Sequence, residues 1–195
     1  MEDTQVKELL LQALTHETGG VQVYEAAVRA AQNEELKEEF GRYLEQTRKH
    51  MRVLQETCQA LDLDPAGRTP GCEVVESLGQ SLVQAIEQAI AAGNPDAAEL
   101  VACECVVLAE TKDHLNWELL GEVAHKLKGD QKKALQAAYD EVEDEEDEHL
   151  YHSKGWCREL WLKSLGMKAV LPPPEERKHV KTAIGAARAD QSRRH

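Results

Sequence analysis

The stretch of sequence that decides the fold is residues 134–165, ALQAAYDEVEDEEDEHLYHSKGWCRELWLKSL. At 3.6 residues per turn, its apolar and small side chains fall on one face of a helix. That face carries Leu135, Ala138, Tyr139, Val142, Leu150, Ser153, Trp156, Cys157 and Leu160. Glu146 and His149 lie on the same face, whereas most other carboxylates of the stretch point toward solvent. The pattern predicts an acidic helix whose core-facing stripe holds one glutamate and one histidine.

Glu146 and His149 are three residues apart, so their side chains lie on adjacent turns and point at one spot. Burying a carboxylate without a partner costs on the order of several kcal/mol, so we expect a positive group opposite Glu146. A pair with this spacing is typical of a metal site inside a helix bundle. The alternative is that one glutamate and one histidine fall on this face by chance in a helix rich in acids.

The composition favours one all-α protein. Proline is scarce before Leu171, and no segment alternates as a strand does. The net charge of -13 argues against binding to nucleic acid or to an anionic membrane. No apolar run reaches the length of a membrane span, and the acidic start Met1-Glu2-Asp3 is unlike a signal peptide. We therefore expect a cytoplasmic protein.

The cysteines do not follow a disulfide or zinc-binding pattern, because they are odd in number and contain no C-x-x-C pair. We expect them to be small buried apolar residues. They are Cys58, Cys72, Cys103, Cys105 and Cys157.

Capping residues and breakers divide the chain into helices. The first helix is predicted from Asp3 or Thr4 to about residue 32, and the second begins after the Asn33 cap. The long connection that follows carries an extra amphipathic helix. The remaining predicted helices are 73–92 in this connection, 95–127 after an Asn-Pro start signal, and 130–165. Two antiparallel hairpins joined by a long crossover would form an up-down four-helix bundle.

The composition changes after Gly166. Three prolines at 172–174 form a stiff spacer, and residues 175–189 predict a short helix that ends in a basic tail with Arg188, Arg193 and Arg194. The predicted division is therefore a bundle over 1–166 and a tail over 167–195. Since the body is acidic, we expect the tail to dock on its own body or on a neighbouring subunit.

Each long helix carries acid or imidazole on a face otherwise built for the core, and Lys and Arg are nearly absent from these faces. The residues are Glu17, His50, Glu110 with Asp113 and His114, and Glu146 with His149. If the carboxylates pair internally, the histidines must be the cations, whereas metal binding would explain the missing Lys and Arg. Oxygen-rich sites with one or two imidazoles suit iron or manganese better than structural zinc.

Individual residues leave alternatives open. Glu17 is either a ligand or the partner of a buried histidine, and His50 is either a ligand or a satisfied core histidine. Tyr24 is either a core residue or a redox tyrosine. Gly19 and Gly20 in a helix interior indicate the close approach of a neighbouring helix or of a ligand beside Glu17.

With these residues in place, the chain resembles the ferritin-like superfamily, in particular di-iron carboxylate bundles of the rubrerythrin and bacterioferritin type. The resemblance covers residues 4–165. The family pattern is Glu in helix one, E-x-x-H in helix two, one or two Glu in helix three and E-x-x-H in helix four. Glu17, Glu110, Glu146 and His149 match it, and Asp113 stands where rubrerythrins place a further carboxylate.

The second helix departs from that pattern. Residues 47–50, T-R-K-H, contain the histidine, but Thr47 stands where a bridging glutamate belongs. Rubredoxin-like cysteine motifs are also missing, so no separate iron site is expected. The departure leaves three options: a mononuclear site, a two-metal site completed by Glu45, Asp113 or His114, or a site that binds no metal.

The resemblance implies a metalloprotein with one or two iron ions per chain, or manganese, that reacts with oxygen or peroxide as a ferroxidase or peroxidase. The expected ligands are Glu17, His50, Glu110, Asp113, Glu146 and His149. A second hypothesis is a non-enzymatic bundle in which these residues form a hydrogen-bonded network. A third is an oxygenase, which a large apolar pocket beside Glu17 would favour. A homodimer is the expected oligomer.

Overall fold

The computed structural model describes residues 3–193, which form seven α-helices and no strand. The all-α prediction is confirmed. Met1, Glu2 and Arg194, which entered the sequence analysis, lie outside the described residues. None of the described helices combines the length and the apolar character that a membrane span requires. The helices are α1 (Asp3–Ala30), α2 (Glu34–Ala60), α3 (Pro70–Ala91), α4 (Pro95–Lys126), α5 (Gly129–Ser164), α6 (Pro174–Arg177) and α7 (Ala183–Ser192).

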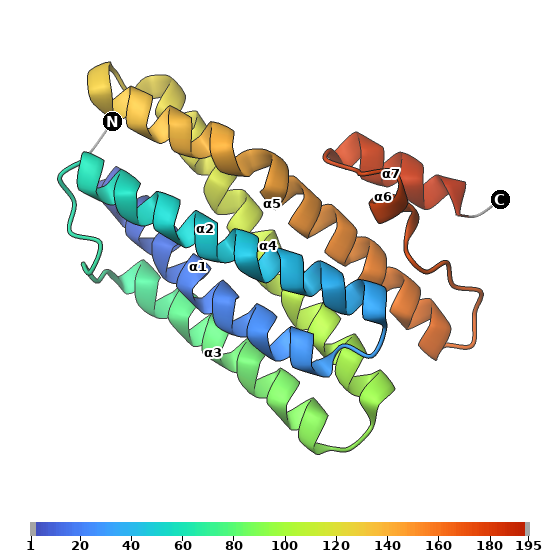
Figure 1. Cartoon of the computed structure of the whole chain (residues 1–195). Coiled ribbons are helices and arrows are strands. Elements are labelled where there is room, and N and C mark those ends of the chain that lie inside the picture. The colour runs from blue at the N-terminus through green and yellow to red at the C-terminus, as the bar shows by residue number, and fades with distance from the viewer. Residues whose placement is uncertain (1–2, 194–195) are drawn as a thin grey trace.

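Helices α1, α2, α4 and α5 pack together as a bundle (Figure 1). Helices α1 and α2 make one antiparallel hairpin, and α4 and α5 make the other. Helix α3 runs back along α1 and carries the chain to the start of α4. Because of this crossover, α2 and α4 point in the same direction, and α1 packs against α4 while α2 packs against α5. The predicted bundle with a helical crossover is therefore the observed fold.

Asn33 and Asn94 cap helices where the sequence predicts them, but two other predictions are wrong: α3 begins earlier, and the single helix predicted over 175–189 is two helices, α6 and α7. The side chain of Asn33 accepts a hydrogen bond from Leu36 N at the start of α2, and Asn94 caps α4 in the same way. Helix α3 begins at Pro70, three residues before the predicted start at residue 73. The reason is that Thr69 caps the helix and a proline is well suited to its first turn.

The glycines of α1 let other helices approach closely. A Cβ atom added at Gly79 in α3 would lie 3.5 Å from the Cα atom of Gly19. A Cβ atom added at Gly20 would lie 3.3 Å from Cγ2 of Thr47 in α2. Of the two reasons predicted for this glycine pair, the structure shows the approach of neighbouring helices.

The interior of the bundle contains two apolar clusters. One includes Tyr24, Phe40, Val106 and Trp156, and the other includes Leu10, Leu54, Trp117 and Val142. Along each bundle helix, the acid and imidazole positions predicted from the sequence fall between the residues of these two clusters. The polar residues therefore form a layer between two apolar regions, each of which limits the access of water.

One apolar face of α4 carries leucine side chains that the described residues leave exposed. Leu108, Leu115 and Leu119 are 56%, 46% and 42% exposed. Burial of such a face in a homodimer would remove these side chains from water. The homodimer itself stays a prediction.

The segment after α5 folds back onto α5, as the red helices in Figure 1 show. Arg158 makes two hydrogen bonds, of 2.7 and 2.9 Å, to the buried carboxylate of Glu175, and its Nε donates to Glu159. Lys181 pairs with Asp144 at 3.2 Å. The tail thus docks on the body of its own chain, while the predicted boundary at residue 166 stays a prediction.

Replacing Arg158 tests this docking. Arg158→Ala leaves Glu159 and Glu175 buried with much of their charge uncompensated, so we expect a loss of about 3 kcal/mol in the free energy of unfolding. Urea denaturation measures the loss, with Arg188→Ala on the exposed surface of α7 as the control. Equal stability of the two variants would show that the pairing contributes nothing.

Candidate metal centre

The polar layer draws one or two side chains from each bundle helix. Helix α1 supplies Glu17 and α2 supplies His50, and neither has any exposed surface. Helix α4 supplies Glu110 and Asp113, and α5 supplies Glu146 and His149. All six predicted ligands are at most 4% exposed. The helical spacing that placed them on core-facing stripes therefore brings them into one buried region.

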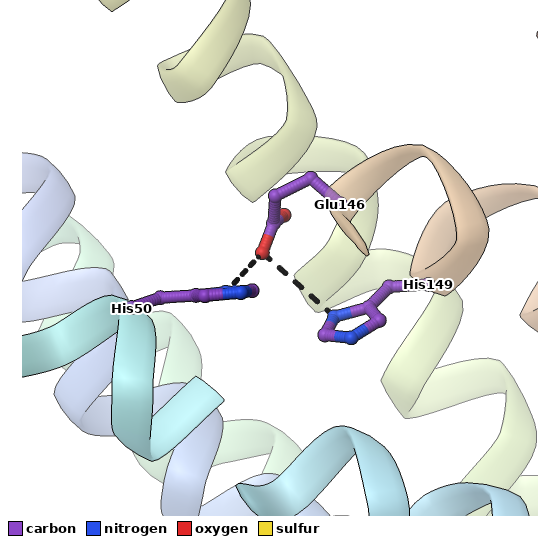
Figure 2. A group of neighbouring side chains, drawn as sticks. All are labelled: His50, Glu146 and His149. Carbon is purple, nitrogen blue, oxygen red and sulfur yellow. Dashed lines mark ion pairs between the residues drawn. The ribbon is translucent and has the colours of Figure 1, made fainter. Parts of the chain in front are cut away.

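Glu146 lies between the two imidazoles, as Figure 2 shows. Its Oε1 atom is 2.7 Å from Nδ1 of His50 and 3.7 Å from Nδ1 of His149. The two imidazole rings are stacked with their centroids 5.5 Å apart. Three ligand atoms, one from each of these residues, lie within 4.8 Å of one another. This spacing is compatible with one metal ion held by two nitrogens and a carboxylate.

A second group of candidate ligands includes the same glutamate. Ligand atoms of Glu17, Asp113 and Glu146 also lie within 4.8 Å of one another. Glu110 belongs to neither group, although its Oε2 atom is 3.6 Å from Nδ1 of His149. Glu146 is therefore the residue that the two candidate groups share.

The outer nitrogen of each imidazole has a partner outside the cluster. Nε2 of His50 is 2.8 Å from Oε2 of Glu145, and Nε2 of His149 is 3.0 Å from Oε1 of Gln46. Both partners are acceptors, so each Nε2 carries a proton and donates it. In a neutral imidazole, Nδ1 then has a bare lone pair. Both lone pairs face the carboxylate of Glu146.

The inner atoms of the cluster have no hydrogen-bond partner among the described residues. This holds for both oxygens of Glu146 and for Nδ1 of both imidazoles, because the short His50 contact lacks hydrogen-bond geometry. It holds equally for one oxygen each of Glu17, Glu110 and Asp113. No described lysine or arginine forms an ion pair with these carboxylates. Unpaired buried polar atoms are costly, so their convergence calls for a cation or for protons.

Burial and mutual repulsion shift the pKa values of these acids. Burial raises the pKa of Glu17 and of Glu146 well above the usual range, and the charge of Asp113 adds to the effect. Burial raises the pKa of Glu110 to about 7. Burial also lowers the pKa of His149, and nearby His50 lowers it further. A divalent cation would reverse these shifts by stabilising the ionised carboxylates.

Two residues that hold the imidazoles were not predicted as part of the site. Burial alone would raise the pKa of Glu145, but the hydrogen bonds from His50 and Lys49 lower it to about 2. Gln46 precedes Thr47 in α2, and its Oε1 atom reaches Nε2 of His149. Both lie at the edges of their helical stripes, and only the packing of α2 against α5 brings them to the histidines.

His16 was also missed. It precedes Glu17 in α1, is 4% exposed, and its Nε2 atom lies 2.9 Å from the carbonyl oxygen of Ala109. No spacing or motif in the sequence marks His16 as part of the site. Its charge, when protonated, would favour the ionised forms of Glu110 and Asp113.

The structure also shows which of the possible substitutes for the missing glutamate of α2 lie in the cluster and which lie outside it. Asp113 lies in the cluster. Glu45 is exposed and pairs with Arg48, so it does not complete the site. Nε2 of His114 is 2.8 Å from Oδ1 of Asp147, outside the cluster. Thr47 is buried with its methyl group close to Gly20, and neither candidate group of described residues contains a carboxylate of α2.

Aromatic side chains surround the cluster. The indole Nε1 of Trp117 donates a hydrogen bond of 2.9 Å to Glu17. Tyr43 and His149 have ring centroids 4.1 Å apart, and the hydroxyl of Tyr43 also contacts Glu39 and His152. Tyr24 is fully buried beside both rings and belongs to the apolar core. These rings restrict the movement of the candidate ligands.

The fold and the site define a helical bundle with a buried group of histidine and carboxylate side chains that could hold a metal ion. Residues 5–150 match the family described as "Domain of unknown function (DUF892)", a family of ferritin-like type. The chain therefore belongs to this family. Neither the curated proteins nor the solved structures contain a significant match.

The raised pKa of Glu110 has a measurable consequence in metal-free protein. In the folded state the carboxyl keeps its proton up to about pH 7, whereas in the unfolded chain it ionises near pH 4.5. Between these values the folded state binds more protons, so rising pH destabilises it, by on the order of 3 kcal/mol for this group. Glu110→Gln has no carboxyl to ionise at this position, so its free energy of unfolding should not fall in this way as the pH rises.

The measurement is urea denaturation of chelator-treated protein at pH 5, 6 and 7.5. We expect the stability of Glu110→Gln relative to the parent to increase over this range. Glu122→Gln, which changes an exposed acid of the same helix, should stay parallel to the parent. A constant difference for Glu110→Gln would mean that Glu110 is already ionised at low pH.

Proposed function

We propose that the protein is a metalloprotein that binds iron, or manganese, in the bundle core and reacts with oxygen or peroxide. The observation that carries the proposal is that two bare imidazole nitrogens face the same buried, unpartnered carboxylate. Carboxylates and imidazoles together suit these metals better than the thiolate-rich sets of structural zinc. Bound iron would supply one-electron redox chemistry toward oxygen or peroxide.

The protein's own residues would do the rest. Glu145 and Gln46 fix the tautomers and the orientations of His50 and His149. Trp117 orients Glu17 through its indole N–H group. The apolar clusters on both sides exclude water, which strengthens the electrostatic interaction of the carboxylates with a cation. One ion would use the imidazole group, and a second would share Glu146 with Glu17 and Asp113.

One observation favours a non-enzymatic alternative. His50 lies between two carboxylates, at 2.8 Å from Glu145 and 2.7 Å from Glu146. A protonated His50 would give an internal ion-pair network without a metal. The oxygenase hypothesis has less support, because the pocket lined by Gly19 is not lined by Glu17.

Metal content separates the first two functions. The untagged protein should contain one or two iron or manganese ions per chain by elemental mass spectrometry. Glu146→Ala with His149→Ala removes the shared carboxylate and one imidazole, so we expect a loss of nearly all bound metal. The matched control is Glu122→Ala with His125→Ala, which removes the same E-x-x-H spacing from the exposed surface of α4.

The control should retain the parent's metal content. Absence of metal from the parent, even after anaerobic loading with iron(II), would reject the metalloprotein and favour the internal network. Equal content in the buried and the exposed double variants would reject this site.

Glu145 offers a separate test of how the site is organised. Glu145→Gln removes the charge that holds the Nε2 proton of His50, and we expect metal affinity to fall about 10- to 100-fold. Competition with a chelator of known affinity measures the change. Glu141→Gln, an exposed acid one turn away on α5, should have little effect. A matching loss in both variants would point to overall charge rather than to the hydrogen bond.

A further inference from the structure

A pocket of about 240 Å³ opens between α4, α5 and the start of α7. Its walls are made by aromatic, acidic and small side chains. They are His114, Trp117, Glu118, Tyr139, Glu143, Glu146, Asp147, Tyr151, Thr182 and Ala183. Glu146 and Trp117 thus belong both to this pocket and to the buried cluster. Glu146 therefore connects the pocket directly with the buried cluster of candidate ligands.

The charged side chains that line the pocket are mostly acidic. Four of its lining residues are acids, one is a histidine, and none is lysine or arginine. The acids are graded by depth, because the side chain of Glu118 is 61% exposed, that of Asp147 is 21% exposed and that of Glu146 is 2% exposed. A path lined in this way attracts cations and raises their concentration at its inner end.

The inner end of the pocket has an unsatisfied acceptor. Glu146 is buried, and neither of its carboxylate oxygens has a hydrogen-bond partner among the described residues. This observation is independent of the acidic rim, since surface acids alone are usually solvated by water. It indicates that the pocket leads to a group able to take a cation.

The C-terminal segment forms one wall of the pocket. The carbonyl oxygen of Val180 lies 3.1 Å from Nε2 of His152, and Lys181 pairs with Asp144 and Glu148, both at 3.2 Å. These contacts hold Thr182 and Ala183 against the opening. Because Lys181 pairs with two acids of α5, these acids offset its charge beside the pocket.

We propose that this pocket is the route by which divalent metal cations reach Glu146 and the buried cluster. The inference rests on the proposed metal site, but it concerns the path and not the ligands. It assigns Glu118 and Glu143 the role of steering the cation. It also assigns the start of α7 the role of a fixed wall that sets the width of the path.

Removing the rim charges tests the steering. Binding of Co²⁺ alone to chelator-treated, full-length protein is followed in a stopped-flow instrument by the visible absorption of the bound ion. For Glu118→Gln with Glu143→Gln we expect the association rate at low ionic strength to fall about tenfold, with the same number of ions bound at equilibrium. Added salt should reduce the difference from the parent.

The matched control is Glu122→Gln with Glu141→Gln. It removes the same charge from exposed positions of the same two helices, and neither position lines the pocket. It should keep most of the parent's rate. Equal rates in the two double variants would overturn the proposal, because the effect would then follow the net charge of the protein.

A steric pair of variants tests the path without changing charge. Ala183→Trp should narrow the opening and slow Co²⁺ binding several-fold, whereas Ala187→Trp, exposed one turn further along α7, should not. Circular dichroism checks that both variants are folded. Unchanged rates for Ala183→Trp would mean that cations reach Glu146 by another path.

The failures of the two proposals can be told apart. If the parent binds no Co²⁺, the metal site itself is rejected and the route with it. If the parent binds Co²⁺ but Glu118→Gln with Glu143→Gln weakens equilibrium binding without slowing association, the rim acids act as ligands and the route is rejected. A slower rate with full occupancy in both pocket variants supports the route.

Discussion

The constraint on which the rest of the structure depends is the burial of Glu146 against two imidazoles and three further acids. Each bundle helix brings a charged or chargeable group to one layer, and the layer lies between two apolar clusters. These groups are buried, and no described lysine or arginine pairs with them. Only protons or a cation can compensate such a layer. Burial of the apolar clusters stabilises the fold and offsets the cost of burying the polar layer. The polar layer in turn provides the candidate metal ligands.

The fold could be predicted in detail because local signals and the apolar pattern agree. Asn33 and Asn94 cap the helices they were expected to cap, and the long connection carries a helix as its pattern indicates. The six candidate ligands could be identified for a related reason: an acid or histidine on a core-facing stripe is conspicuous where Lys and Arg are missing. Periodicity along one helix is enough to place such a residue in the interior.

Residues that act across helices could not be predicted in this way. Glu145 is one of many acids in its stretch, and its hydrogen bond to His50 depends on the packing of α2 against α5. Gln46 is a neutral residue at the edge of its stripe until His149 comes within 3.0 Å. The same limit applies to the tail, because its basic character predicts docking on an acidic body but not the pairing of Arg158 with Glu175.

Thr47 shows how one substitution changes the balance of the whole layer. Its methyl group packs against Gly20, so the place of a carboxylate on α2 is filled by an apolar contact between helices. All carboxylates of the layer then come from α1, α4 and α5, while α2 contributes only His50. The two candidate groups therefore differ in composition, because one contains both imidazoles with Glu146 and the other contains three carboxylates. The first group offers two nitrogen donors, whereas the second carries three acids and needs more positive charge for compensation. The two positions should therefore differ in metal preference, which a symmetric bridging pair would not produce.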